Sequence, residues 1–248
     1  MDYKRLRLRR LYKNEKIFCV PLDHGITTGE IGNLYDFSNT VEKIISNGAT
    51  SIIVHRGMVR FLPKDLKNIG LIIHLSGSTK YVHEVEKTLV TSVSTAIKVG
   101  ADAVSFHINL GNQYERNMLK DLAQVSSECD KYQIPLLVMM YIRDNNNEDI
   151  STPERIKHGI RIVSELGADI VKISYKWEDT SMLNEIVKDS QIPVIVAGGE
   201  LIRSDIDFIN KTKRIMKSNI DGISYGRNIF LSHNIEETME KLSKIVIG

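Results

Sequence analysis

Short apolar runs alternate along the chain with amphipathic stretches, and this alternation predicts strands followed by helices. Eight runs rich in β-branched residues begin near residues 17, 51, 71, 103, 136, 170, 194 and 222. Their length suits buried parallel strands. Between most of them apolar residues recur at helical spacing, as in Val85, Leu89, Val93 and Ile97. The gap between the second and third runs is too short to require a full helix.

A degenerate repeat accompanies these runs. Gly48, Gly100 and Gly167 each follow a helix-like stretch and precede an alanine and a strand, and residues 219–224 form a weaker fourth copy. Glycine suits the left-handed position that ends a helix. Thr152 followed by Pro153 is a good helix start, because the hydroxyl caps and proline tolerates the first turn. The eight units predict an α/β TIM (β/α)8 barrel, a single domain over residues 1–248 with a basic N-terminal segment at 1–15.

Composition narrows the class of protein without indicating its chemistry. The 248 residues suit one barrel, and no Gly-x-Gly-x-x-Gly follows the first strand, which argues against a dinucleotide-binding sheet. The formal net charge of +2 gives no case for nucleic acid or membrane partners. No apolar run approaches the ~18 residues of a membrane span. With a charged N-terminus and only two cysteines, we expect a cytoplasmic protein without disulfides.

Polar residues gather where the predicted strands end, which in a barrel is the end that carries the chemistry. Alternation places His74, Ser105, His107 and Lys172 on the inward face of their strands, and the intervening apolar residues outward. Lys172 stands inside the apolar run 170–173, and lysine is rarely buried without a function. Burial favours the neutral amine, which can attack a carbonyl and form a Schiff base. A phosphate contact or an ion pair with Asp23 is the structural alternative.

Two glycine motifs end the seventh and eighth strands, where barrels often bind phosphate. Gly198-Gly199 and Gly226 allow close backbone approach, and Arg227 can grip an anion with two hydrogen bonds. Asp23 and Tyr141 are the candidates for proton transfer. An ion pair or cap explains the former equally well, and simple packing explains the latter.

Two other features have competing interpretations. His24, His74 and His107 could together hold zinc at the mouth, although no recognised zinc motif is present. The basic run 4–10 could contact RNA or a phosphorylated ligand, but a solvated or subunit-contacting segment fits the nearly neutral chain better.

These strand ends closely resemble those of the archaeal-type class I aldolases over nearly the whole chain. That group contains archaeal fructose-bisphosphate aldolase and 2-amino-3,7-dideoxy-D-threo-hept-6-ulosonate synthase. Residues 20–25, 171–175, 197–199 and 226–230 match the family's motifs, and 54–60, 70–77 and 139–141 resemble the synthase branch.

The resemblance implies a Schiff-base aldolase or transaldolase with Lys172 as nucleophile, Tyr141 as proton donor and Asp23 assisting proton transfer. The implied substrate-binding positions are His24, Gly25, Ile26, Thr27, Arg143, Gly198, Gly199, Gly226 and Arg227. The implied partners are a phosphorylated keto-sugar and a small aldehyde, L-aspartate 4-semialdehyde in the synthase branch, whose product feeds aromatic amino acid biosynthesis. We expect neither a cofactor nor a metal, and by resemblance a homo-oligomer.

The chain departs from the family pattern at the mouth. Ile142 and Asp144 replace the proline and glycine that flank the arginine in the synthases, and Glu200 replaces a proline. A class I fructose-bisphosphate aldolase and an aldolase of secondary metabolism that uses dihydroxyacetone phosphate are the alternative enzymes. A catalytically inactive sugar-phosphate-binding protein is the alternative of another class.

Overall fold

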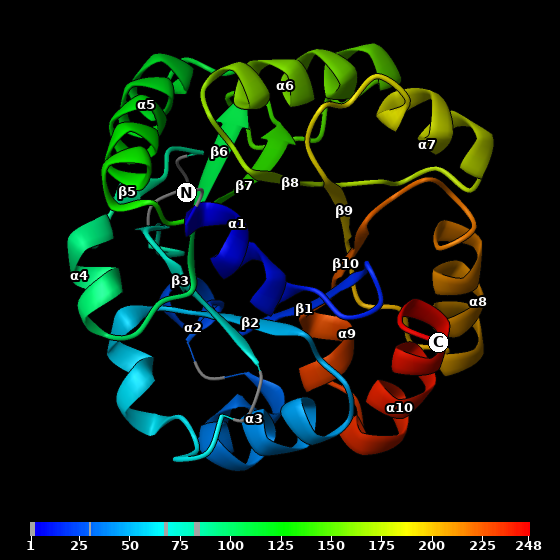
Figure 1. Ribbon diagram of the computed structural model, residues 1–248. Helices are drawn as coiled ribbons and strands as arrows, with labels where there is room; N and C mark the ends of the chain where they lie inside the picture. The colour runs from blue at the N-terminus through cyan, green and yellow to red at the C-terminus, as the bar shows by residue number, and fades with distance from the viewer. Residues whose placement is uncertain (1–2, 30, 67–68, 82–84) are drawn as a thin grey trace.

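The computed structural model describes residues 3–29, 31–66, 69–81 and 85–248, which form a closed barrel of parallel strands inside a ring of helices (Figure 1). The strands follow one another round the barrel in the order β1-β10-β9-β8-β7-β6-β3-β2. They are β1 (Ile17–Pro21), β2 (Ser51–Val54), β3 (Gly70–His74), β6 (Ala103–Leu110), β7 (Leu136–Ile142), β8 (Ile170–Ile173), β9 (Val194–Ala197) and β10 (Gly222–Ser224). The predicted TIM barrel is confirmed, and each of the eight expected strands is present.

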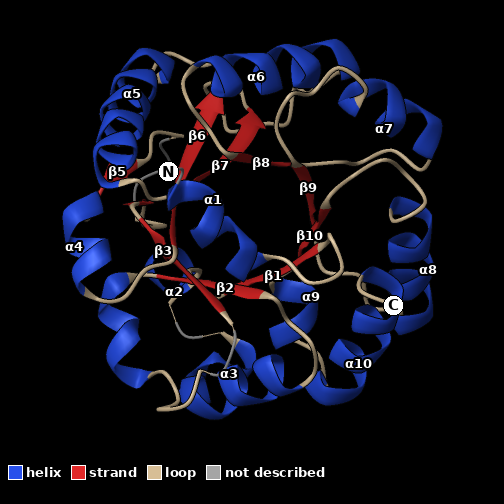
Figure 2. Cartoon of the chain, in the orientation of Figure 1, coloured by secondary structure: helices blue, strands red, loops and turns tan. Residues whose placement is uncertain are grey.

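Helices cover the outside of the barrel, as the separation of blue and red in Figure 2 makes plain. The helices of the outer ring include α3 (Phe37–Ser46), α4 (Val93–Lys98), α5 (Glu115–Tyr132), α6 (Pro153–Glu165), α7 (Thr180–Val187), α8 (Asp205–Ile215) and α10 (Ile235–Val246). The other helical segments are α1 (Tyr3–Leu8), α2 (Gly25–Thr28), α9 (Arg227–Phe230) and the 3-10 helices η1 (Arg9–Leu11), η2 (Gly32–Asp36) and η3 (Arg56–Phe61). Among the described residues between β2 and β3 the helical segment is η3 alone, as the short gap predicted, and Thr152 caps α6 as expected.

The helical pattern over residues 85–97 was misleading in its first half. Residues 88–89 form β5 (Thr88–Leu89), which pairs antiparallel with β4 (Ser76–Gly77), so that Leu89 lies opposite Ser76. The helix starts only after Ser92, whose hydroxyl accepts a hydrogen bond from the Thr95 amide. Pairing with the end of the third strand therefore outweighs the local spacing, and the chain forms a hairpin over the mouth.

The two faces of the strands carry different side chains, as alternation predicted. Ile73, Val104 and Val171 pack outward with the helices in the main hydrophobic core. A second cluster fills the barrel interior, with Cys19, Leu137, Met139, Ile170 and Ile195 among its members. The polar inward residues sit above this cluster, at the end where the strands finish. The polar residues of the site therefore rest on the apolar side chains that fill the barrel interior.

The repeat has a structural role at the end of the barrel where the strands begin. At the same position of each copy a side chain accepts a hydrogen bond from the first backbone amides of the neighbouring strand. The pairs are Thr50 with Phe18, Asp102 with Leu71, Asp169 with Leu136 and Asp221 with Val194, all at 2.8–2.9 Å. These bonds hold adjacent strands in register, because each amide would otherwise lack a partner at the strand start.

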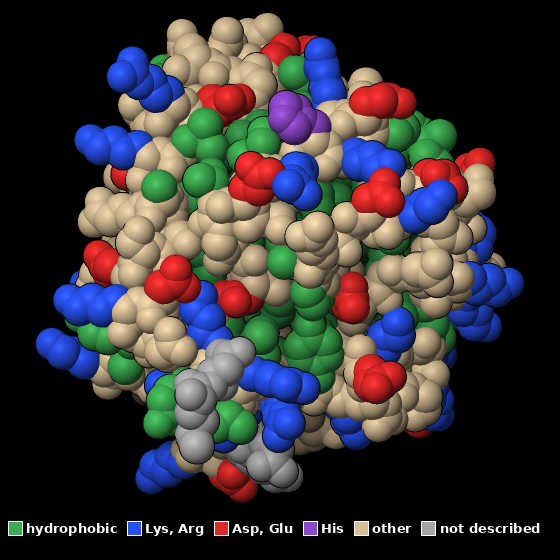
Figure 3. Space-filling view, turned by 45° about the horizontal axis from the view of Figure 1, so that its top comes forward, with side chains coloured by type: hydrophobic (Ala, Val, Ile, Leu, Met, Phe, Trp, Pro, Cys, Tyr) green, Lys and Arg blue, Asp and Glu red, His purple; other side chains and the backbone are tan. Residues whose placement is uncertain are grey.

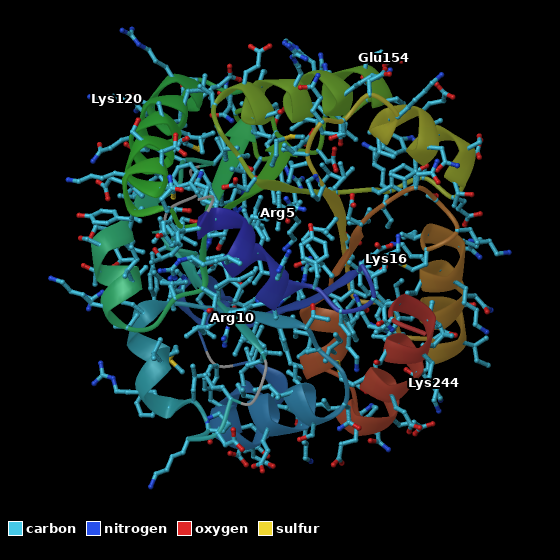
Figure 4. The ribbon with its side chains drawn as sticks, in the orientation of Figure 1. Arg5, Arg10, Lys16, Lys120, Glu154 and Lys244 are labelled. Carbon is cyan, nitrogen blue, oxygen red and sulfur yellow. The ribbon has the colours of Figure 1, made fainter. Side chains whose placement is uncertain are left out.

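The basic N-terminal segment closes that end of the barrel. Helix α1 crosses the open centre of the ring in Figure 1, and Leu11 is fully buried in the interior cluster. Lys4 pairs with Asp130 at 2.7 Å and Asp169 at 3.1 Å, and Arg10 pairs with Asp102 at 2.7 Å. Arg5 and Arg10 lie near the centre in Figure 4, whereas Lys120 and Lys244 lie on the outer ring. Lys4 and Arg10 thus meet the aspartates of the strand starts, while Arg5, Arg9 and Arg10 stay exposed. The expectation of a solvated or subunit-contacting segment remains a prediction.

One face of the molecule is electrostatically mixed. Acidic and basic side chains are interspersed over the face shown in Figure 3. Within the part of the chain that the structure describes, no helix has the length and apolar character needed to cross a membrane.

Candidate active site

A cavity of about 730 Å³ opens at the carboxyl ends of the strands, with Lys172 in its wall. Lys172 lies on β8 between Met139 and Ile195 of the neighbouring strands, and its side chain is 6% exposed. Its Nζ atom is 4.0 Å from the Met139 sulfur. Among the described residues it makes no ion pair within 4.0 Å, so the amine is held by packing and is available to a ligand.

Asp23 follows β1 and lies between two imidazoles. Its carboxylate oxygens are 3.5 Å from Nδ1 of His24 and 3.7 Å from Nε2 of His74. Burial alone would raise the pKa of Asp23, but the charges that His74, His24 and Lys172 can carry outweigh it and hold the pKa at about 2. Asp23 is therefore a carboxylate at neutral pH, in electrostatic contact with the amine of Lys172.

The histidines of the mouth are neutral by the same balance of burial and charge. Burial lowers the pKa of His74 to about 4 even though Asp23 opposes the shift, and burial also lowers the pKa of His107 well below its usual value. Ser105 shares a hydrogen bond of 2.8 Å with His74, and Asn109 shares one of 3.0 Å with His107. Neutral imidazoles of this kind can exchange protons with a substrate but cannot neutralise a phosphate.

Tyr141 lies at the end of β7, on the inward side, where its ring stacks near His107 with centroids 4.8 Å apart. The guanidinium of Arg143 lies 6.0 Å from the centre of the tyrosine ring. Tyr141, Arg143 and Lys172 all line the 730 Å³ cavity. A hydroxyl, an amine and a guanidinium therefore face one space.

The glycine motifs form the opposite wall of this cavity. Arg227 donates a hydrogen bond of 2.8 Å to the Gly199 carbonyl, which joins the loops after β9 and β10. Gly199 has a positive φ of 75°, and a side chain at Gly226 would lie 2.8 Å from the Pro21 carbonyl oxygen and from His24. The backbone conformation favours glycine at position 199, and the close approach of Pro21 requires it at position 226. Backbone amides with an adjacent guanidinium are groups that bind phosphate.

The predicted site residues are not all in one cavity. His24, Gly198, Gly199, Gly226 and Arg227 line the space that contains Lys172. Asp23, Gly25 and Ile26 instead line a second cavity of about 1010 Å³ over β1 and β2. The Thr27 hydroxyl donates to the Ser78 carbonyl at 2.9 Å. Asp23 is the link, since it touches His24 of one cavity while lining the other.

The sequence analysis missed three residues of the mouth. His55 lines the second cavity near Asp23, and Lys211 lines the first close to Gly199. Lys87 lies on the β4–β5 hairpin, in the stretch that was interpreted as a helix. The only sequence signal for Lys87 was its proximity to the third strand end. For the zinc alternative, the described residues contain no group of three or more His, Cys, Asp or Glu side chains placed to hold a metal ion.

A barrel with an inward lysine on β8, a carboxylate after β1 and phosphate-type loops after β9 and β10 defines the class of Schiff-base aldolases. The comparisons with known proteins agree. The model of the DeoC/LacD family aldolases matches residues 17–232, and the chain belongs to this family.

Relatives and solved structures support the same class. The chain is 38% identical over 248 residues to 2-amino-3,7-dideoxy-D-threo-hept-6-ulosonate synthase 1 of Archaeoglobus fulgidus, covering 99% of this chain and 91% of the relative. It is 34% identical over 245 residues to 2-amino-4,5-dihydroxy-6-oxo-7-(phosphonooxy)heptanoate synthase of Streptomyces griseus, covering 97% and 89%. A Schiff-base-forming fructose-1,6-bisphosphate aldolase has a similar structure, with a TM-score of 0.87, 26% identity and coverage of 98% and 99%. The protein is thus a class I aldolase or transaldolase.

Proposed function

We propose that this protein joins a three-carbon unit from a keto-sugar phosphate to L-aspartate 4-semialdehyde, with Lys172 as the Schiff-base residue. The observation that carries the proposal is the amine of Lys172, 6% exposed and without an ion pair among the described residues, in a cavity walled by Gly198, Gly226 and Arg227. An amine so placed can attack a carbonyl, while the loops hold the phosphate of the same molecule.

The first step forms the covalent intermediate. The Lys172 amine adds to the donor ketone, and the carbinolamine loses water to give an iminium ion. Asp23, a carboxylate at neutral pH, stabilises that positive charge and assists the proton transfers. Tyr141, at the end of the neighbouring strand, donates and accepts the proton at the reacting oxygen. Cleavage of the donor carbon–carbon bond, or loss of a proton from the carbon next to the iminium, leaves an enamine.

The second step builds the product. The enamine carbon attacks the aldehyde, whose oxygen takes up a proton, and water then hydrolyses the iminium and regenerates the amine of Lys172. The product named for the Streptomyces griseus relative carries an amino group, a ketone and a phosphate on one seven-carbon acid. Aldol addition of a three-carbon keto-phosphate to a four-carbon amino-acid aldehyde makes that skeleton. This agreement favours an amino-acid aldehyde over the glyceraldehyde phosphate of a fructose-bisphosphate aldolase.

The binding of both substrates is assigned by location. His24, Gly198, Gly199, Gly226 and Arg227 bind the phosphorylated donor, with Arg143 at the rim. Gly25, Ile26 and Thr27 lie on the other side of Asp23 and shape the approach of the aldehyde. Location in the cytoplasm and a homo-oligomeric state, the latter by resemblance, complete the proposal. Size-exclusion chromatography with light scattering tests the oligomeric state.

Borohydride trapping tests the nucleophile and the donor together. The purified protein is incubated with dihydroxyacetone phosphate or with a deoxy-ketohexose phosphate, reduced, digested and analysed by mass spectrometry. We expect one adduct, on the peptide that contains Lys172, and none on Lys176 or Lys211, which line the same cavity. Turnover with the semialdehyde should persist in the presence of a chelator. An adduct on another lysine, or activity that a chelator abolishes while no adduct forms, would refute the proposal.

A substrate panel separates the remaining alternatives. A fructose-bisphosphate aldolase would cleave fructose 1,6-bisphosphate faster than it condenses the semialdehyde. A sugar-phosphate-binding protein without activity would bind the donor, as seen by calorimetry, but would turn over none of these substrates.

A further inference from the structure

A second lysine, Lys87, lies at the mouth of the barrel without a role in the chemistry above. It directly precedes β5, which pairs with β4 just after the end of β3. Asn109 at the end of β6 donates a hydrogen bond of 2.6 Å to the Val85 carbonyl, and Thr27 donates to the Ser78 carbonyl. These two bonds tie the chain before Lys87 to α2 and to the end of β6.

The charge of Lys87 has no counter-ion among the described residues. Its ammonium group donates to the Ser78 hydroxyl, and no carboxylate of the described residues lies within ion-pair distance. Burial lowers the pKa of Lys87, while the charge of Asp23 opposes that shift. A partly buried cation that is satisfied only by one neutral hydroxyl is electrostatically incomplete, and a negatively charged ligand would complete it.

The position of Lys87 indicates which negatively charged ligand would bind there. In the order of strands round the barrel, β3 and β6 stand across from β9 and β10. The donor phosphate belongs to the loops after β9 and β10, where Arg227 and the glycines lie. An anion beside Lys87 therefore lies across the barrel mouth from the donor phosphate. It also lies near Thr27, which bonds Ser78 as Lys87 does and which the proposed function places beside the aldehyde.

We propose that Lys87 binds the carboxylate of the aldehyde acceptor and thereby selects amino-acid aldehydes over neutral ones, an inference that rests on the proposed function. The acceptor would lie between Lys87 and the enamine, with its aldehyde carbon toward Lys172. His74 on β3 and His107 on β6 are neutral, so neither imidazole can supply the positive charge that a carboxylate needs here. Service as a counter-charge for Asp23, which opposes the lowering of the Lys87 pKa, is the structural alternative, but the two described side chains form no ion pair within 4.0 Å.

The experiment compares two acceptors and two half-reactions. Lys87→Met and Lys87→Gln remove the charge, Lys87→Arg keeps it, and Lys80→Met is the matched control because Lys80 is an exposed lysine of the same hairpin. The acceptors are L-aspartate 4-semialdehyde and its methyl ester, which lacks the carboxylate charge. Borohydride trapping with the donor alone reports the first half-reaction, and thermal melting reports folding.

In Lys87→Met and Lys87→Gln we expect KM for the semialdehyde to rise at least about tenfold, as the loss of one charge-assisted hydrogen bond predicts. KM for the ester and the yield of the donor adduct should stay within about twofold, Lys87→Arg should recover most of the loss, and Lys80→Met should behave as the unchanged protein.

The inference is overturned if both acceptors lose the same factor, if KM for the semialdehyde does not change, or if the donor adduct is lost in the variants. It is also overturned if the unchanged protein forms the adduct but does not use the semialdehyde. Absence of any adduct in the unchanged protein would instead refute the proposed function, and this inference with it. If the melting temperature of Lys87→Met is lowered, the kinetics of Lys87→Gln decide between these outcomes, because its amide is polar but uncharged.

Discussion

Acidification should destabilise this protein because His74 is buried as a neutral imidazole. Its pKa is about 4 in the folded protein, against a reference of 6.5 for the unfolded chain. The folded value is the lower one, so between these two values the unfolded chain binds more protons. The stability from keeping His74 neutral is therefore complete above pH 6.5 and falls as the pH drops toward 4. At pH 5 the linkage relation puts the loss at about 2 kcal/mol for this residue alone.

Urea unfolding at pH 7.5 and pH 5.0 measures this loss. His74→Asn removes the titration and keeps a polar group near Ser105, which now bonds His74 at 2.8 Å. We expect the free energy of unfolding to fall between the two pH values by about 2 kcal/mol less in His74→Asn than in the unchanged protein. His233→Asn is the control, because His233 is exposed. If His74→Asn and the unchanged protein lose the same amount, the reasoning about a buried neutral histidine is refuted.

Three further predictions concern the lysine, the phosphate loop and the strand starts. Lys172→Met should abolish the borohydride adduct and leave Tm within about 4 °C, since Lys172 has no ion pair among the described residues; an adduct that persists contradicts its role. Arg227→Met should raise KM for the phosphorylated donor at least about tenfold and leave KM for the aldehyde unchanged, and steady-state kinetics with each substrate varied decides. Asp169→Ala should cost about 1–3 kcal/mol in urea unfolding because it frees a backbone amide. Asp130→Ala, at the exposed end of the same Lys4 pair, should cost less than about 1 kcal/mol; equal costs would contradict the assignment.

The barrel could be predicted from the sequence because its strands and helix ends depend on residues that are close together along the chain. Each strand is a short β-branched run, and the glycine before three of them ends a helix with a positive φ, as at Gly48, Gly100 and Gly167. The inward direction of Lys172 also followed from alternation, since a strand side chain can point only in or out. The hairpin at residues 76–89 was not predictable in this way, because its pairing depends on which strand end the segment meets.

The sequence predicted which chemical groups form the candidate site, but not that these groups are divided between two cavities. The residue types at the strand ends indicated an amine, a carboxylate and a phosphate-binding loop. Nothing in the sequence showed that Asp23 stands between two cavities, or that Gly25 and Ile26 face away from the Lys172 cavity. The basic run at residues 4–10 was a further example. Its charges meet Asp102, Asp130 and Asp169, which are distant along the chain and become neighbours only when the barrel closes.

The amino-acid sequence by itself determined the eight strands, the faces of those strands and the chemistry at their ends, because these depend on local periodicity and on residue type. The tertiary structure alone decided which charges lie together. The neutral state of His74, the carboxylate state of Asp23 and the lowered pKa of Lys87 depend on burial and on distances across the barrel mouth. Electrostatic energies depend on separation in space and on exclusion of water, and neither quantity is written in the order of residues along the chain.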